Sequence, residues 1–316
     1  MNHDDLQAWR RLPLPELLTL ALRTKLAFRQ RRLSLCSIVN AKAGGCSEDC
    51  RFCVQSAHYR TASPVHPLKS REEIVAAALE AKRIGAGHFS IVTAGRGLGN
   101  KEVETVAAMV EEITGQIGIK VCASLGILSF EALKRLRHAG LVRYHHNLEA
   151  AREFFPSVVT THTFEERVET ILAARAAGLE VCAGGIIGLG ESEDDRISMA
   201  LTLKQYEVDS VPLNILMPLA GTPMADNPAL PVAEVLRTIA LYRLILPAIP
   251  LRLAAGRSAQ GLGDFLGAAF MAGADGLMIG GYLTQGCRPP AEDQRFVTLI
   301  QELWAQAGPG AGAHTR

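Results

Sequence analysis

The sequence predicts an α/β fold, a (β/α)8 barrel of the TIM type preceded by an N-terminal leading helix. Short apolar or β-branched runs alternate with longer segments of helical periodicity, the pattern of a parallel sheet covered by helices. Eight such units occupy most of the 316 residues, and one such barrel uses about 250 residues. No linker or low-complexity tract divides them, so we expect one domain over residues 1–316. A doubly wound open sheet is the alternative, because the same alternation precedes both folds.

The elements follow one another in a regular order. Leucine and alanine at helical spacing in residues 5–30 predict an amphipathic helix, and residues 1–32 are expected to form a helical cap. Glycines near the end of the chain predict a mobile tail at 308–316. Strands are predicted at 33–40, 88–94, 120–126, 143–149, 180–188, 210–219, 250–256 and 276–281. Helices are predicted at 70–86, 101–117, 129–139, 164–178, 192–208, 232–247, 261–273 and 293–307.

The composition favours a small-molecule substrate. The formal net charge is +1, whereas nucleic-acid-binding proteins usually carry a basic excess or a basic stripe. Residues 1–13 are charged and lack the apolar core of a signal peptide, and no run of about 18 uninterrupted apolar residues predicts a membrane span. We therefore expect a cytoplasmic protein with no nucleic-acid or membrane partner.

The seven cysteines are expected to serve metal or redox chemistry, because disulfides are rare in the cytoplasm. Cys46, Cys50 and Cys53 form a CxxxCxxC run with no fourth ligand nearby. Structural zinc normally takes four protein ligands, whereas iron–sulfur clusters take cysteines in close runs and can leave one iron open. The run follows the first predicted strand, and barrel active sites lie at the carboxyl ends of strands. We therefore expect an iron–sulfur cluster at the barrel mouth.

The spacing of these cysteines, with the aromatic Phe52 before the last of them, resembles the radical S-adenosylmethionine (SAM) superfamily. The flanking segments, 36–45 and 54–59, resemble the biotin synthase family, and the similarity runs from about residue 33 to 284. The resemblance implies a [4Fe-4S] cluster on the three cysteines, with SAM on the open iron beside Phe52. It implies sulfur insertion into dethiobiotin through a 5′-deoxyadenosyl radical, because no side chain is basic enough to activate such C–H bonds. It also implies a flavodoxin- or ferredoxin-type electron donor and a homodimer.

The fourth predicted strand is too polar for a barrel wall unless its side chains meet a ligand. By the resemblance, Asn147 contacts SAM or the substrate, and Glu149 contacts the ribose of SAM. His145 and His146 cannot share a metal, because neighbours on a strand point to opposite faces. Each histidine has a hydrogen-bonded core residue as its alternative interpretation.

Three further positions are carried over from the family. The glycine-rich segment 184–190 resembles the family's SAM-lining segment, which implicates Gly184 and Gly185, with a plain strand-to-helix turn as the alternative. Asn214, in an otherwise apolar strand, matches the family's substrate-contacting asparagine. Arg167 is expected to bind the carboxylate of SAM or to pair with a glutamate of its own helix.

A second set of residues lies early or midway in predicted strands one, three, five and seven: Cys36, Cys122, Cys182 and Arg252. Inward side chains of alternate strands form layers across a barrel, so the four are expected to converge. Behaviour as small buried hydrophobic residues is the alternative for each cysteine. The set resembles the auxiliary iron–sulfur cluster of the biotin synthase family, held there by cysteines and an arginine, whose sulfide is inserted. Arg252 as a ligand rests on resemblance alone, since arginine does not readily give up a proton.

This chain departs from the usual pattern on two strands. Ser90 stands where the family usually has a cysteine, and Cys36 stands where many members have a serine. The number of ligands is kept, but the geometry need not be, so the auxiliary cluster is expected to be [2Fe-2S] or larger. Cys287, after the last strand, is the alternative to Arg252 as a ligand.

Two rival interpretations stay open. A related radical SAM enzyme, of hydrogenase-maturase or mutase type, would not require the cysteines at 36, 122 and 182 together. A non-enzymatic iron–sulfur scaffold would leave the barrel and the polar fourth strand unexplained.

Overall fold

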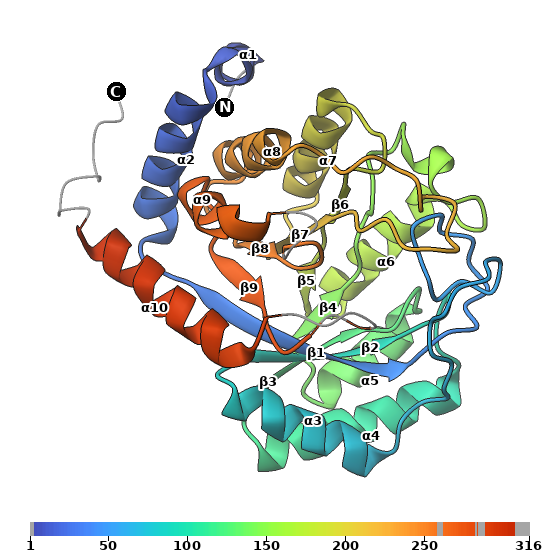
Figure 1. Ribbon diagram of the computed structural model, residues 1–316. Coiled ribbons are helices and arrows are strands. Elements are labelled where there is room, and N and C mark those ends of the chain that lie inside the picture. The colour runs from blue at the N-terminus through green and yellow to red at the C-terminus, as the bar shows by residue number, and fades with distance from the viewer. Residues whose placement is uncertain (1–2, 258–261, 282, 284–287, 307–316) are drawn as a thin grey trace.

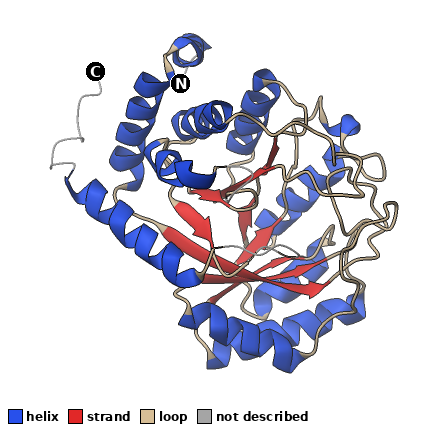
Figure 2. Cartoon of the chain, in the orientation of Figure 1, coloured by secondary structure: helices blue, strands red, loops and turns tan. Residues whose placement is uncertain are grey.

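The computed structural model describes residues 3–257, 262–281, 283 and 288–306. Within these residues, nine strands form one sheet in the order β5-β4-β3-β2-β1-β9-β8-β7-β6, and all paired neighbours are parallel. Helices surround this sheet on its outer side (Figures 1 and 2). The strands are β1 (Ser34–Lys42), β2 (His88–Thr93), β3 (Lys120–Ser124), β4 (Arg143–His145), β5 (Glu180–Cys182), β6 (Gly185–Ile187), β7 (Val211–Ile215), β8 (Leu251–Leu253) and β9 (Gly276–Met278).

The two ends of the sheet, β5 and β6, are halves of one interrupted strand, and their backbone closes the barrel. On one side, the N–H of His146 donates to the carbonyl of Cys182 at 3.0 Å, and the N–H of Leu148 donates to the carbonyl of Gly184 at 2.8 Å. On the other side, the N–H of Ala183 donates to the carbonyl of Ser210 at 3.0 Å. The predicted (β/α)8 barrel is confirmed, with its fifth strand broken in the middle.

The interruption has a steric cause. A Cβ atom at Gly184 would lie 1.9 Å from the carbonyl oxygen of Pro212 on β7. Glycine lets the two backbones come this close, and Pro212 has no N–H to offer a neighbouring strand. The regular ladder therefore breaks here.

The leading segment forms two helices where one was predicted. α1 ends at Arg11 and α2 begins at Leu14, with Pro13 as its N-cap. Proline lacks the N–H that a continuous helix needs, so it separates the two. α2 lies beside α8 and α9 (Figure 1), and its Lys25 ammonium stands 3.0 Å from the ring centroid of the buried Trp304 on α10.

The helices covering the barrel alternate with the strands as predicted. No helix in the described part of the chain combines the length and apolar character needed to cross a bilayer. The helices are α1 (His3–Arg11), α2 (Leu14–Arg29), α3 (Arg71–Arg83), α4 (Asn100–Gln116), α5 (Phe130–His138), α6 (Phe164–Ala176), α7 (Glu193–Gln205), α8 (Val232–Ile245), α9 (Leu266–Met271) and α10 (Pro290–Gln306).

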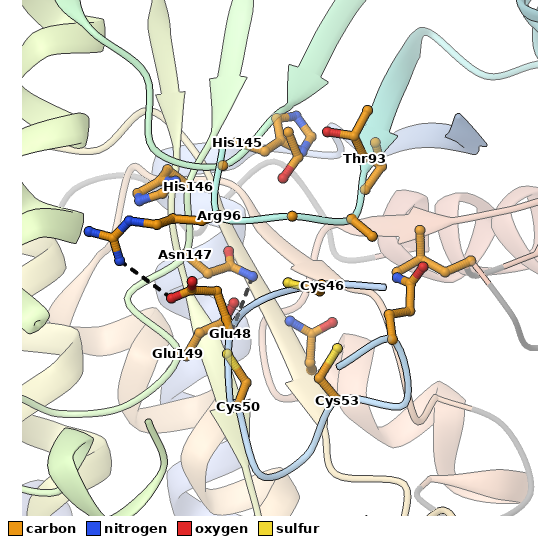
Figure 3. A pocket seen from close by; sticks show the side chains of 18 of the residues that line it. Cys46, Glu48, Cys50, Cys53, Thr93, Arg96, His145, His146, Asn147 and Glu149 are labelled. Carbon is orange, nitrogen blue, oxygen red and sulfur yellow. Dashed lines mark hydrogen bonds and ion pairs between the residues drawn. The ribbon is translucent and has the colours of Figure 1, made fainter. Parts of the chain in front are cut away.

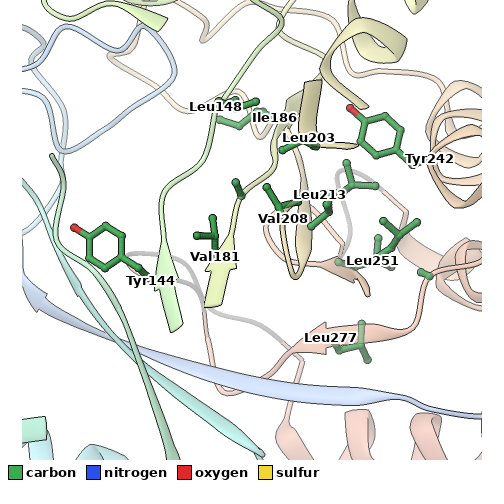
Figure 4. Packing of buried hydrophobic residues seen from close by; sticks show 14 of the residues in the cluster. Tyr144, Leu148, Val181, Ile186, Leu203, Val208, Leu213, Tyr242, Leu251 and Leu277 are labelled. Atoms are coloured by element: carbon green, nitrogen blue, oxygen red, sulfur yellow. The ribbon is translucent and has the colours of Figure 1, made fainter. Parts of the chain in front are cut away.

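The main hydrophobic core lies between the strands and the helices. Val181, Leu213, Leu251 and Leu277 are buried members of it and come from four different strands (Figure 4). Because side chains alternate along a strand, the residues next to these point into the barrel. A separate small cluster, of Cys36, Ala254 and Met278 with Ile38 packed on it, fills part of that interior. The strand residues that face the helices therefore form the main core, and the strand residues that face the barrel interior include the candidate functional side chains.

Candidate active site

A cavity of about 250 Å3 lies at the carboxyl ends of the strands, which we call the mouth. Cys46, Cys50 and Cys53 line it from the segment after β1, together with Phe52. Figure 3 shows these cysteines across from the residues that end and follow β4. Other predicted positions line it too: His145, His146, Asn147, Glu149, Arg167 and Asn214.

The cysteine loop is closed by its own backbone. The N–H of Cys46 donates to the carbonyl of Gln55 at 3.0 Å, and the N–H of Ala57 donates to the carbonyl of Cys46 at 2.8 Å. Within the loop, the N–H of Cys53 donates to the carbonyl of Cys50 at 2.9 Å. Residues 46–57 therefore form one closed turn that carries three thiols to the same cavity.

These thiols suit an iron–sulfur cluster. Burial raises the pKa of Cys50 and raises that of Cys53 to about 11, so neither is a stable thiolate without a nearby cation. Iron supplies such a cation, and thiolate is its preferred ligand in clusters. Among the described residues, no three His, Cys, Asp or Glu side chains close on a point suited to a single metal ion. In a cluster each thiolate binds a different iron, so its ligands stand farther apart than those of one ion.

The two acidic residues between the cysteines tie the loop to the segment before α6. Buried Glu48 accepts hydrogen bonds from Thr161 Oγ1 at 2.9 Å and from His162 Nδ1 at 2.5 Å. Burial opposes ionisation of Glu48, but these hydrogen bonds outweigh it and lower its pKa. Asp49 accepts from the backbone N–H groups of Thr160 at 2.9 Å and Thr161 at 3.2 Å. Burial also opposes ionisation of Asp49, yet hydrogen bonds from Thr160 and Thr161 lower its pKa to about 2.

His162 links this loop to Arg167. Arg167 Nε donates to His162 Nε2 at 3.1 Å, and its Nη1 donates to the backbone carbonyl of Asn147 at 2.8 Å. A guanidinium can only donate, so His162 Nε2 accepts and its Nδ1 carries the proton given to Glu48. Burial and the charge of Arg167 lower the pKa of His162, in keeping with a neutral ring. Arg167 thus points to the mouth, and its hydrogen-bond partners among the described residues are His162 and Asn147 rather than a glutamate of α6.

The segment after β4 is strained where it meets the cavity. Glu149 has a φ of 68°, in the left-handed region that non-glycine residues rarely adopt. Its carboxylate accepts from Asn147 Nδ2 at 3.4 Å, and burial raises its pKa despite the nearby Arg167. The Asn147 carbonyl oxygen, Oδ1, accepts from the N–H of Gly184 at 3.2 Å. This geometry holds the Glu149 carboxylate at the cavity.

Gly184 and Gly185 act through the backbone around them. A Cβ at Gly185 would lie 2.6 Å from the carbonyl oxygen of Glu149 and 2.5 Å from Met199 Sδ. Neither glycine is among the residues that line the cavity. Their role here is close approach of strands, which positions Asn147 and Glu149; direct contact with SAM stays a prediction.

Asn214 has backbone partners at both ends of its amide. Its Nδ2 donates to the carbonyl of Gly185 at 3.2 Å, and its Oδ1 accepts from the N–H of Ala255 at 3.1 Å. The side chain therefore fixes β7 to its neighbours while it lines the cavity. The predicted strand ends earlier than expected, at Ile215.

The second predicted set, Cys36, Cys122, Cys182 and Arg252, is buried inside the barrel, and we call it the interior layer. Arg252 Nη1 donates to Ser210 Oγ at 3.2 Å and lies 3.8 Å from Cys182 Sγ. Burial raises the pKa of Cys36 and raises that of Cys122 to about 12, while the charge of Arg252 opposes both shifts. Cys287 lies outside the described residues, as does the predicted tail at 308–316.

The interior layer is surrounded by polar atoms without hydrogen-bond partners. Among the described residues these include His88 Nδ1, Ser90 Oγ, His145 Nε2 and Arg252 Nε. Burial, with Arg143 and Arg252, lowers the pKa of His88 to about 3. Burial and the charge of Arg252 lower the pKa of His145 well below its ordinary range, so both rings are neutral. An unpaired buried polar group costs about 1–3 kcal/mol, which a bound group in this space would offset.

Comparison with known proteins identifies the family. Residues 42–203 match the model of the Radical SAM superfamily, and residues 212–300 match that of the Biotin and Thiamin Synthesis associated domain. The chain is 50% identical to the biotin synthase of Pelotomaculum thermopropionicum over 288 residues, 91% of this chain and 89% of that protein. It is 46% identical to the biotin synthase of Thermotoga neapolitana over 276 residues, 87% of this chain and 98% of that protein. The chain belongs to the biotin synthase family.

The barrel of this biotin synthase family member is shared with more distant enzymes. Methylornithine synthase superposes with a TM-score of 0.81 at 18% identity, over 95% of this chain and 92% of that one. The FeFe-hydrogenase maturase HydG from Carboxydothermus hydrogenoformans superposes with a TM-score of 0.76 at 18% identity, over 93% of this chain and 76% of that one. At these identities the likeness concerns the fold alone. The close sequence relatives, and not the fold, therefore separate the biotin synthase interpretation from the maturase and mutase rivals.

In this biotin synthase family member, sequence reasoning missed Glu48 and His162. Glu48 has a sequence signal, since an acidic residue between two predicted cluster cysteines is expected to accept hydrogen bonds from another segment. His162 lies 114 residues away from Glu48, so no local pattern shows the contact.

Proposed function

We propose that this chain is a radical SAM sulfurtransferase that inserts sulfur into dethiobiotin to form biotin. The observation that carries this proposal is the convergence of the three-cysteine loop with Asn147 and Glu149 on one cavity, in a chain about half identical to biotin synthases. The scaffold alternative does not explain such a cavity.

At the mouth, Cys46, Cys50 and Cys53 would hold a [4Fe-4S] cluster, which when bound supplies the electron for reductive cleavage of SAM. Glu149 would accept hydrogen bonds from the ribose of SAM, since its carboxylate faces the cavity. Arg167 would bind the carboxylate of SAM with the donors that His162 and Asn147 leave unused. Phe52 packs beside the cysteines, and Gly184 and Gly185 hold the β4 segment in place.

The substrate would lie between the mouth and the interior layer. Asn147 and Asn214 line the cavity and carry the donors and acceptors that a cyclic urea needs. Much of the hydrogen-bonding capacity of Asn214 is already used by Gly185 and Ala255, which fixes its orientation. The remaining N–H and oxygen lone pair of Asn214 would therefore be held in a fixed direction toward the substrate.

The interior layer would hold an auxiliary cluster, [2Fe-2S] or larger, which when bound supplies the sulfur. Cys36, Cys122 and Cys182 are the thiol ligands of this proposal, and Arg252 is the fourth group that the family resemblance names. The buried thiols and the unpaired polar atoms around them support a bound group here. Cys287 remains the alternative to Arg252.

Other parts of the proposal rest on the family alone. We infer a homodimer in the cytoplasm that takes electrons from a flavodoxin- or ferredoxin-type donor. We also infer one domain for the whole chain, since strands from both matched regions share a single sheet.

Anaerobic turnover tests the function and separates its rivals. Reconstituted protein is mixed with SAM, dethiobiotin and a reductant, and biotin and 5′-deoxyadenosine are quantified by mass spectrometry. A biotin synthase forms both products, and biotin depends on dethiobiotin. A maturase or mutase forms 5′-deoxyadenosine without biotin, and a scaffold forms neither; either result overturns the proposal.

A further inference from the structure

His145 is an inward-facing side chain to which neither the fold nor the mouth gives a hydrogen-bond partner. It is the last residue of β4 and lines the cavity. Its Nε2 atom is buried and has no hydrogen-bond partner among the described residues. Burial without a partner costs about 1–3 kcal/mol, so an unpaired imidazole at this depth calls for a ligand.

The strand register places His145 beside the interior layer. His145 pairs with Cys182 on β5, and Arg143, two residues earlier on β4, pairs with Cys122 on β3. Paired residues of neighbouring strands share a face of the sheet. His145 therefore lies on the strand between two of the interior thiols, on the same inner face and level with one of them.

Ser90 occupies the corresponding level on the other side of Cys122. Ser90 pairs with Cys122 across β2 and β3, and its Oγ also has no partner in the described part of the chain. A neutral hydroxyl is a poor ligand for iron–sulfur centres compared with thiolate or imidazole. Of these two groups, His145 is the one suited to iron; His88, whose Nδ1 is also unpaired, pairs with Cys36 and lies two residues before Ser90 on β2.

Arg252 lies 3.8 Å from Cys182 Sγ and His145 pairs with Cys182 in the strand register, and the two nitrogen groups differ in chemistry. A guanidinium offers five N–H donors and no lone pair, so Arg252 serves Cys182 and Ser210 as a donor. A neutral imidazole offers a lone pair and is the commonest protein ligand for metals. Histidine replaces cysteine on one iron of Rieske clusters, so the ligand type has precedent in iron–sulfur chemistry.

We propose that in this chain His145 Nε2, in place of Arg252, is the fourth protein ligand of the auxiliary cluster, with Cys36, Cys122 and Cys182, and that Arg252 is a hydrogen-bond donor to the Cys182 sulfur. This inference rests on the proposed function, because it requires an auxiliary cluster in the interior layer. The imidazole keeps its proton on Nδ1 and gives the Nε2 lone pair to iron, with no change of redox state. The site then combines three thiolates with one neutral nitrogen, and Ser90 is not needed as a ligand.

The test uses nitrogen isotopes to identify the atom bound to iron. The full chain carries Cys46→Ala, Cys50→Ala and Cys53→Ala, so that only the auxiliary cluster assembles on anaerobic reconstitution. It is prepared with [15N]histidine, with [15N]arginine or unlabelled, and the reduced cluster is studied by pulsed EPR. The expected result is a nitrogen coupling of directly bound imidazole that changes from the 14N to the 15N pattern only with labelled histidine.

Two variants locate that nitrogen in the sequence. His145→Asn should abolish the coupling, whereas His88→Asn should keep it, because His88 is the matched inward histidine on β2. A coupling that follows labelled arginine, that is absent, or that survives His145→Asn overturns the proposal. Failure of the proposed function looks different: the triple variant then holds no iron or sulfide at all, and no cluster signal is seen.

Discussion

Two groups of cysteines lie at different depths of the barrel, and their surroundings differ in hydrogen bonding. At the mouth, the acidic side chains of the cysteine loop have several partners each, and His162 and Arg167 extend this network to Asn147. In and around the interior layer, Arg252 Nε, His145 Nε2 and Ser90 Oγ have none among the described residues. The protein therefore fixes the cysteine loop by its own hydrogen bonds, whereas the region of the interior layer keeps polar atoms that the proposed auxiliary cluster would pair.

This difference bears on the chemistry of the two sites. A site that keeps its geometry through many turnovers benefits from a loop held by protein hydrogen bonds. A site whose sulfur is consumed and replaced has to open its ligands to exchange. The cysteine loop, whose acidic side chains are satisfied, and the interior layer, which keeps unpaired atoms, fit these two roles.

The largest effect is expected from the mouth cysteines. Cys46→Ala, Cys50→Ala and Cys53→Ala should each abolish reductive cleavage of SAM, because each leaves an iron without its thiolate. The measurement is 5′-deoxyadenosine formed per chain under anaerobic conditions. Wild-type rates in any one of the three variants would remove that residue from the cluster.

The interior cysteines should separate the two products. Cys36→Ala, Cys122→Ala and Cys182→Ala are expected to eliminate biotin and to spare 5′-deoxyadenosine, because these residues are assigned to the sulfur source. Both products are quantified in one reaction, with Cys50→Ala as the control that loses both. Biotin formation by one of these variants would show that its cysteine is a buried apolar residue and not a ligand of the auxiliary cluster.

The His162 bridge tests whether the mouth network positions SAM. His162→Phe leaves Glu48 and Arg167 without their shared partner, and hydrogen bonds to charged groups are worth about 1.5–3 kcal/mol each. We expect the KM for SAM to rise about tenfold or more, with the iron content of the mouth cluster retained. His162→Gln keeps one donor and one acceptor and should recover most of the loss. Equal KM values in both variants and the parent would show that Arg167 needs no bridge.

Asp49 gives a smaller effect, on stability. Hydrogen bonds from Thr160 and Thr161 lower its pKa from the ordinary 3.8 to about 2. A lowered folded-state pKa adds stability above the unfolded value, and this contribution is lost as the pH falls from 3.8 through about 2. Since Asp49 is partly exposed, we expect Asp49→Asn to cost only about 1 kcal/mol at neutral pH. Urea unfolding of the cluster-free protein at pH 7 and at low pH checks this, because the difference from the parent should shrink in acid.

The smallest effect is expected at Ser90. Ser90 Oγ has no partner among the described residues, so Ser90→Ala should change auxiliary iron and sulfide by less than about twofold. The Cys36→Ser variant should lose the iron of the auxiliary cluster. The double variant, Cys36→Ser with Ser90→Cys, should regain part of that iron, because thiolate binds cluster iron better than a hydroxyl. Iron and sulfide are measured in chains that lack the mouth cysteines. Loss of iron in Ser90→Ala, with Cys36→Ser intact, would place the ligand on β2.

The sequence predicted the barrel because its signals are local. Alternating apolar runs mark the strands, and the cysteine spacing and the polar end of strand four mark the mouth. The split of the leading helix has a local signal as well, Pro13. The break in the fifth strand could not be predicted, because it depends on Gly184 meeting Pro212 across two strands. The bridge from Glu48 to Arg167 was missed for the same reason, since its members meet only in the folded chain.

The close approach of Gly184 and Pro212 has a consequence for how the chain tolerates mutation. Ser210, the residue directly before β7, contacts Arg252 of the interior layer. Asn214, on β7 itself, lines the mouth. A single methyl group at residue 184 would lie 1.9 Å from the Pro212 carbonyl oxygen, so the two strands would have to move apart. One small substitution at a residue with no side chain of its own would therefore disturb both the interior layer and the mouth.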